Sequence, residues 1–314
     1  MRAATIRDGE VVVAEHPDPQ PGKGEVLVRV RAAGLNGADL HQKAGRYPAP
    51  PGSPPDIPGL ELAGEVAANG PGATRFAEGD RVMAIVGGGG QAELAVVHER
   101  QLMPVPGPLG WPEAGGTPEV FTTAHDALFT QAGLHAGERL LVHGAAGGVG
   151  TAAVQLGAST GAHVTATVRR PELRDGVAAL GAHAVIDPEG FADHGPFDVV
   201  LELVGAPNLP ANVGALATGG RIVVIGIGAG AKGELNLAAL MGLRGSISAS
   251  TLRPRPLEEK ALTARAMEHH VLPLLERRAL RVPVAETYPL DDVAAAYERF
   301  AAGGKLGKIV LLMG

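Results

Sequence analysis

A glycine-rich turn at residues 144–150 is the segment whose residue types and spacing point most directly to chemistry. It reads Gly-Ala-Ala-Gly-Gly-Val-Gly and follows an apolar run that predicts a strand. In the pattern G-x-G-x-x-G, the first glycine makes a tight turn, the second lets a pyrophosphate approach the backbone, and the third allows close helix–strand packing. Those positions hold Ala145, Gly147 and Gly150 here, so the first departs from the pattern.

Backbone N–H groups at the start of the helix that follows this turn would favour an anion such as a pyrophosphate. A strand before the turn, a helix after it and a second strand beyond supply the context that a dinucleotide site requires. A turn with a purely structural role is the alternative. The residues predicted to bind the dinucleotide here are Ala145, Ala146, Gly147, Gly148, Val149 and Gly150.

The end of the second predicted strand, His163–Thr167, indicates which dinucleotide binds. A protein that uses NAD usually carries Asp or Glu about 20 residues after the glycines, where it bonds the ribose 2′-hydroxyl. This chain has no acid there and instead has Arg169, Arg170 and Arg174. A guanidinium group matches the oxygens of a 2′-phosphate, and cations at a helix start are unfavourable unless an anion is near. We therefore expect NADPH, with Thr167 also in its site, although the arginines could simply face solvent.

The elements that must position this turn alternate between strand and helix from about residue 118 onward. Their strand segments are apolar throughout, as in parallel strands that helices cover on both faces. The predicted fold class is therefore α/β, with a doubly wound six-stranded parallel sheet. The six predicted strands are Arg139–His143, His163–Thr167, Ala184–Asp187, Asp198–Val204, Arg221–Gly226 and Ser246–Ser250.

The chain on either side of this alternation has a different pattern. Apolar and polar residues alternate at 26–31, which predicts a half-buried strand, and proline-rich loops surround it. Further on, a helical pattern runs from about 254 to 280, Asp291 is the predicted N-cap of a helix that extends to Ala302, and Gly307–Met313 predicts a last strand. We expect a small β-rich domain that the tail rejoins. The predicted domains are 1–118 with 254–314, and 119–253 for the dinucleotide.

Composition excludes several classes of protein. The chain has 314 residues and a formal net charge of −6, which argues against a general affinity for nucleic acid or acidic membranes. It contains no cysteine, so disulfides, thiolate catalysis and thiolate-ligated metals are excluded. No apolar run has transmembrane length, and the N-terminus lacks the apolar segment of a signal peptide. We therefore expect a cytoplasmic protein.

Several segments together resemble the zinc-independent quinone oxidoreductases of the medium-chain dehydrogenase/reductase family, over essentially the whole chain. The resemblance implies a GroES-like β-rich substrate domain beside a Rossmann dinucleotide domain. It also implies hydride transfer to quinones or similar conjugated carbonyls, and a homodimer formed through the sheet edge near Arg244–Thr251. The segments that carry it are the glycine turn, Asn36–Leu40, Gly45–Pro48, Pro58–Glu61, Ser246–Arg253 and Leu306–Val310.

The zinc-dependent relatives in this family place a Cys ligand where this chain has Asn36 and a His ligand where it has Leu60. Asp39 and Glu61, which accompany those ligands, are still present. None of the eleven histidines shows the HExxH spacing, so we expect no metal site and no tetrahedral zinc. Without a Lewis acid nothing lowers the pKa of an alcohol hydroxyl. Reduction of an electron-poor acceptor is therefore expected rather than alcohol oxidation.

The resemblance also implies that Asn36, Tyr47 and Thr123 lie beside the nicotinamide. An amide N–H and a phenol O–H are suitable donors to an oxygen that becomes negative. Each residue has a structural alternative: Asn36 in a turn, Tyr47 packed among prolines, and Thr123 bonded to backbone. Gly226 and Gly228 are expected to let the cofactor pass close to the backbone.

His41 stands where relatives often carry a phenol, five residues after Asn36. This departure leaves open both the shape of the acceptor pocket and whether an imidazole assists protonation. Two other functions also stay open. One is an enoyl or enone double-bond reductase with the same fold and cofactor, and the other is a protein that binds NADPH with little turnover.

Overall fold

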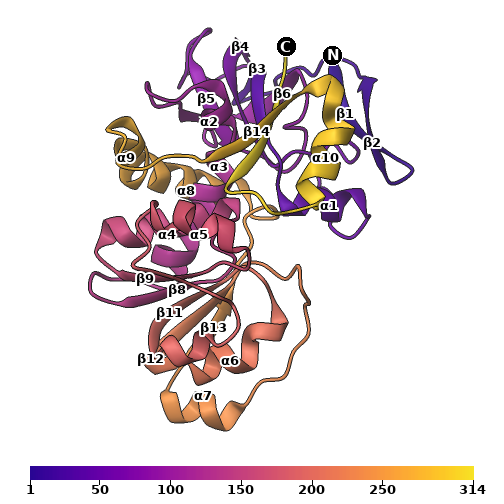
Figure 1. Ribbon diagram of the computed structural model, residues 1–314. Coiled ribbons are helices and arrows are strands. Elements are labelled where there is room, and N and C mark those ends of the chain that lie inside the picture. The colour runs from indigo at the N-terminus through magenta and orange to yellow at the C-terminus, as the bar shows by residue number, and fades with distance from the viewer. The chain divides into compact units, whose positions relative to one another are not determined.

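The computed structural model describes all 314 residues, and the chain divides into two compact units (Figure 1). The first unit contains Met1–Thr122, Leu252–Gly303 and Lys308–Gly314, and the second contains Thr123–Thr251 and Gly304–Gly307. The C-terminal part of the chain is therefore divided between the units, because Gly304–Gly307 belong to the second unit.

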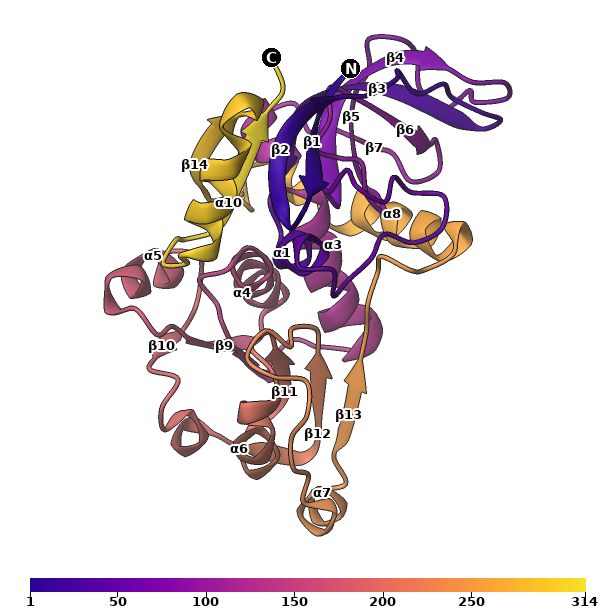
Figure 2. The same cartoon turned by 90° about the vertical axis from the view of Figure 1, so that its right-hand side faces the viewer.

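The second unit is built on a six-stranded parallel sheet with the strand order β10-β9-β8-β11-β12-β13 (Figure 2). This confirms the predicted doubly wound α/β fold. Its central strands are buried on both faces, and Leu140, Leu141, Val199 and Val200 have no exposed surface. Continuous apolar runs suit such positions. The strands are β8 (Arg139–Val142), β9 (His163–Thr167), β10 (Ala184–Ile186), β11 (Phe197–Glu202), β12 (Leu216–Val224) and β13 (Ser246–Ala249).

Helices flank this sheet, and the most buried of them follows the glycine turn directly. It is α4 (Gly148–Thr160), which packs on β8 and β9 and ends at Gly161 in the left-handed conformation. After β9, a 3₁₀ turn at Pro171–Leu173 precedes the short helix α5. The other helices are α3 (Pro118–His125), continued by a π-helix (Asp126–Gln131), α5 (Arg174–Ala178), α6 (Leu209–Gly214) and α7 (Leu237–Leu243).

The first unit contains a seven-stranded sheet and a separate hairpin, which confirms the predicted β-rich domain. In β3 (Glu25–Gly34), Val26, Val28 and Val30 are buried whereas Arg29 is exposed, as the alternation predicts. C-terminal elements complete the sheet, because β15 pairs with β3. The other strands are β1 (Arg2–Arg7), β2 (Glu10–Glu15), β4 (Glu61–Asn69), β5 (Arg81–Ile85), β6 (Leu94–His98), β7 (Met103–Pro104), β14 (Val284–Pro289) and β15 (Lys308–Leu312).

Two predictions about the helices of the first unit are wrong. The pattern from 254 to 280 is not one helix, since Pro273 cannot donate a helical hydrogen bond and a new helix starts around it. The N-cap of the last helix is Asp292, while Asp291 pairs with Arg2 at 2.8 Å. None of the helices is long and apolar enough to cross a membrane. The helices are α1 (Gly37–Lys43), α2 (Trp111–Gly115), α8 (Leu257–His270), α9 (Leu272–Glu276) and α10 (Val293–Ala301).

Candidate functional site

The glycine turn lies between β8 and α4, as a dinucleotide site requires. Gly144 rather than position 145 makes the tight turn, because Gly144 has φ +61° whereas Ala145 is fully buried and donates to the Thr167 carbonyl. A Cβ on Gly150 would lie 2.5 Å from the Gly144 oxygen, so only glycine fits there. The fold therefore tolerates alanine at position 145, because Gly144 adopts the left-handed conformation that the tight turn needs.

The N-terminus of α4 fits a pyrophosphate. Gly147 is the N-cap and no side chain bonds the first turn, so its N–H groups lack helical acceptors. A Cβ on Gly147 would meet only the Gly144 oxygen, at 3.4 Å, which leaves the outer side open. Gly307 fixes the turn from the C-terminal segment, since its N–H donates to the Ala146 carbonyl at 2.8 Å. The first turn of α4 therefore leaves backbone N–H groups and open space beside Gly147.

Gly226 and Gly228, which are also predicted to lie in the cofactor site, have different surroundings. A Cβ on Gly226 would collide with the Leu203 carbonyl, so packing inside the protein explains that residue. A Cβ on Gly228 would meet nothing within 4 Å. Only Gly228 therefore leaves open space of the kind that a cofactor could use.

The arginines after β9 are not equivalent. Arg174 is engaged, because it donates to Asp187 at 2.6 Å and to the Val168 carbonyl at 3.2 Å. Arg169 is exposed. Arg170 has a loose ion pair with Glu172 at 3.7 Å, and its guanidinium lies against Gly304. These two guanidinium groups are therefore the better candidates for a phosphate.

Thr167, which the sequence placed in the cofactor site, has a buried side chain. Its hydroxyl lies 3.2 Å from Nδ1 of His143, and His143 Nε2 lies 2.8 Å from Oδ1 of Asn212. Asn212 in turn donates to Glu202, which also accepts from the backbone N–H of Val204 at 2.6 Å. The Thr167 hydroxyl thus belongs to a buried network that fixes the ends of β8, β9 and β11.

Sequence reasoning missed this network, because it considered the histidines other than His41 only as possible metal ligands. Burial lowers the pKa of His143, so its imidazole is neutral at physiological pH. Since Asn212 Oδ1 can only accept, the proton is on Nε2, and Nδ1 accepts from Thr167. Polar residues at the ends of two apolar strands were the available signal.

In the first unit, Asn36 has its amide fully engaged. Its Nδ2 donates to Glu61 Oε1 at 3.0 Å and to the Gly34 carbonyl at 3.3 Å, and its Oδ1 accepts from Lys308 Nζ at 2.7 Å. Asn36 is 6% exposed, and its backbone N–H donates to Asp39. A substrate oxygen would therefore have to compete with the long bond to Gly34.

Lys308 is the residue that the sequence did not single out. Its ammonium lies 2.6 Å from Glu61 Oε1 and donates to Asn36 Oδ1 and the Leu35 carbonyl, each at 2.7 Å. Lys308 is 2% exposed and Glu61 is fully buried. The Lys308 side chain therefore contacts both Asn36 and Glu61.

The residues present do not fit the zinc that the wider family implies. An ammonium already occupies the space beside Asn36, and Leu60 offers an apolar side chain at the position of a ligand. Nowhere in the chain do three His, Asp or Glu side chains gather so that they could hold a metal ion. Zinc sites use three or four protein donors at close to 2 Å.

Asp39 lies next to this cluster and has an unusual proton affinity. Burial raises its pKa to about 6, against the opposing effect of N–H donation from Asn36 and Gly59 and of the Lys308 charge. Gln91 links its carboxyl to the buried phenol of Tyr297. Asp39 therefore takes up a proton as the pH falls through about 6.

The structure brings two of the three predicted catalytic residues into one unit. Asn36 caps α1, and Tyr47 follows the same helix with its side chain half-buried. His41 lies on α1 between them and is also half-buried. Thr123, which is 6% exposed on α3, belongs to the second unit.

Comparison with known proteins gives two family matches and many relatives. Residues 22–107 match the Alcohol dehydrogenase GroES-like domain, and residues 180–311 match the Zinc-binding dehydrogenase family. The chain is 33% identical to the quinone oxidoreductase of Lama guanicoe over 94% of this chain and 91% of that protein. The Homo sapiens quinone oxidoreductase is 31% identical with the same coverage.

One further relative and the solved structures extend this picture. The spectinabilin polyketide synthase system protein NorB of Streptomyces orinoci is 36% identical over 92% of this chain, but only 13% of that protein is covered. A crystal structure of an NAD-dependent alcohol dehydrogenase covers both chains fully, with a TM-score of 0.88 at 29% identity. A thermostable alcohol dehydrogenase from Pyrobaculum aerophilum has a TM-score of 0.86 at 31% identity, over 99% of each chain.

Proposed function

Because this chain belongs to the medium-chain dehydrogenase/reductase family, in its quinone oxidoreductase group, we propose that it is a zinc-free reductase that transfers hydride from NADPH to quinones or similar conjugated carbonyls. The observation that carries this proposal is the buried ammonium of Lys308 between Asn36 and Glu61. The ammonium does not supply the Lewis acidity of a zinc ion, so we favour reduction of an electron-poor acceptor over oxidation of an alcohol.

The second unit would hold the cofactor. N–H groups in the first turn of α4 suit the pyrophosphate, and Arg169 and Arg170 suit the 2′-phosphate of NADPH. When bound, NADPH supplies the hydride. The engaged Arg174 supports the site indirectly, because its bonds to Asp187 and Val168 order the segment that carries the other two arginines.

The first unit would bind the acceptor. A phenol O–H at Tyr47 is a suitable donor to the oxygen that becomes negative on reduction. Asn36 has a fixed amide and is better suited to shaping the wall of the site than to donating freely. Thr123, which belongs to the second unit, is proposed to contact the nicotinamide. Orientation of the reactants would then supply most of the rate enhancement.

A panel of acceptors tests this proposal. With NADPH as donor, we expect kcat/KM for benzoquinones and naphthoquinones to exceed that for enones and 2-enoyl thioesters, since quinones accept hydride with little help from the protein. Steady-state NADPH oxidation on both panels measures this preference. A wide margin in favour of the enones would overturn the quinone assignment, and tight NADPH binding without oxidation on either panel would indicate a binding protein.

One observation favours a second acceptor class. The 36% identity with a segment of a polyketide synthase system protein exceeds the identity with the animal quinone oxidoreductases. The alternative function is therefore reduction of the double bond of an enone or enoyl thioester, with the same fold and cofactor. A homodimer formed through the edge of the nucleotide sheet and a cytoplasmic location complete the proposal.

A further inference from the structure

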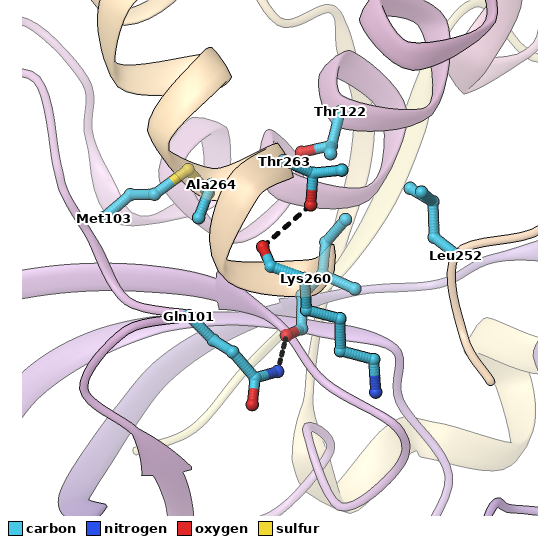
Figure 3. Close-up of a pocket in the computed structure, with 8 residues that line it drawn as sticks. Gln101, Met103, Thr122, Leu252, Lys260, Thr263 and Ala264 are labelled. Carbon is cyan, nitrogen blue, oxygen red and sulfur yellow. Dashed lines mark hydrogen bonds between the residues drawn. The ribbon is translucent and has the colours of Figure 1, made fainter. Parts of the chain in front are cut away.

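A small pocket in the first unit lies beside α8, and the residues that line it include Gln101, Thr122, Lys260 and Thr263 (Figure 3). The side chain of Gln101 donates to the Ile85 carbonyl at 3.2 Å, and that of Thr263 donates to the Lys260 carbonyl at 2.8 Å. The free space of about 10 Å³ is that of roughly one water molecule. The pocket is therefore too small for a quinone or a dinucleotide, and selection of such a ligand has to depend on other residues.

The short segment Gly304–Gly307 packs on the second unit at the candidate cofactor site. The Gly307 N–H donates to the Ala146 carbonyl in the glycine turn at 2.8 Å. The Leu306 side chain lies against Gly176 on α5, where a Cβ would be 2.7 Å from its Cδ2. The segment is therefore held both by the glycine turn and by α5.

Gly304, at the start of this segment, leaves the space in which the guanidinium of Arg170 lies. A Cβ on Gly304 would overlap Nε, Cζ and Nη1 of Arg170, which are all within 2.7 Å of its position. The Arg170 side chain is nevertheless 47% exposed. The backbone at Gly304 therefore covers one side of the guanidinium, while much of the side chain stays open to solvent.

This contact gives the guanidinium a defined position before any ligand binds. A long side chain loses rotational freedom when it is ordered, so an arginine that is already in place binds a phosphate at a lower entropic cost. The ion pair with Glu172 orders the side chain only weakly, because it is exposed and its atoms are 3.7 Å apart. The main restraint on the Arg170 guanidinium is therefore its contact with Gly304.

We propose that Gly304 is a positioning residue that sets specificity for the cofactor: its backbone holds the Arg170 guanidinium where it binds the 2′-phosphate of NADPH. This inference rests on the proposed function, since it explains how the same site distinguishes NADPH from NADH. The segment that fixes the glycine turn through Gly307 thus also fixes the guanidinium through Gly304.

Two neighbouring glycines provide a matched pair of variants. Gly303 and Gly304 both have a left-handed backbone, with φ +64° and +66°, so alanine strains the two positions to a similar extent. A Cβ on Gly303 would meet nothing within 4 Å, whereas one on Gly304 would meet Arg170. The atoms that it meets are the far end of a flexible side chain, so Gly304→Ala displaces the guanidinium without disrupting the fold. The melting temperatures of the two variants should therefore agree.

The measured quantity is the ratio of the Kd for NADH to the Kd for NADPH, from fluorescence titration of each reduced dinucleotide. We expect Gly304→Ala to lower this ratio roughly three- to tenfold, because the 2′-phosphate then has to order a displaced guanidinium. Gly303→Ala should leave the ratio at the parent value. If the parent prefers NADPH and both variants keep its ratio, the inference is overturned while the proposed function stands.

A double variant shows whether the effect passes through Arg170. Once Arg170 is alanine there is no guanidinium to displace, so Gly304→Ala with Arg170→Ala should have the same ratio as Arg170→Ala alone. Effects that multiply would show that Gly304 acts in another way and would overturn the inference. Equal affinity of the parent for NADPH and NADH would overturn both the inference and the proposed cofactor. Failure to reduce any quinone would count against the proposed function alone, because the titrations need no turnover.

Discussion

Replacement of Lys308 by methionine is expected to destabilise the protein by about 3–5 kcal/mol. The substitution keeps much of the apolar stem but removes the ammonium that binds Glu61, Asn36 and the Leu35 carbonyl. Glu61 would then be a fully buried carboxylate that retains only N–H donors from Asn36 and Glu119. Thermal melts followed by circular dichroism measure the effect, which corresponds to a fall in Tm of about 10 °C.

Two further variants make this result specific to the buried ion pair. Lys23→Met changes an exposed lysine of the same unit and should leave Tm within a degree or two. The double variant Lys308→Met with Glu61→Gln should recover part of the loss, because it no longer buries an unpaired charge. If Lys308→Met melts at the parent temperature, the ammonium is not the partner of a buried carboxylate and the account of this cluster is wrong.

The second large effect is expected at the end of β9. Arg170→Ala should weaken NADPH binding roughly tenfold or more, because a charge-assisted hydrogen bond to the 2′-phosphate is lost. NADH lacks that phosphate, so its affinity should change little. Titration of each reduced dinucleotide, followed by the change in its fluorescence, gives the two Kd values.

Other residues provide controls for the cofactor prediction. Lys232→Ala, at an exposed lysine of the second unit, should leave both affinities unchanged. Arg174→Ala should have a smaller effect than Arg170→Ala, because Asp187 already binds that guanidinium. Equal affinity of the parent protein for NADPH and NADH would remove the basis for the 2′-phosphate argument.

Local patterns were sufficient to predict the second unit. Continuous apolar runs such as Leu140–Val142 are buried on both faces. A run of this kind is enough to predict a buried parallel strand. The glycine turn was equally predictable, since backbone atoms only a few residues away leave no room for a side chain at Gly150. Boundaries were less predictable where one residue decides them, as Pro273 does between α8 and α9.

The polar clusters were not predictable from the sequence, because their members are far apart in it. Lys308 reads as an ordinary residue at the start of a strand, and only the pairing of β15 with β3 brings it to Asn36 and Glu61. Arg253 likewise depends on tertiary contacts with Tyr47 and Gln42. Residue type could suggest chemistry at Asn36, but it could not show that both amide hydrogens are already used.

Hydride transfer without zinc is tested most directly by measuring NADPH oxidation with 1,4-naphthoquinone after exhaustive treatment with a chelator. The metal content of the same sample is determined by mass spectrometry, and zinc is then added back. The lysine-filled site predicts a rate per chain that neither the chelator nor added zinc changes, because no donor set for zinc exists. A rate that falls in proportion to the zinc removed, and returns when zinc is restored, would contradict it.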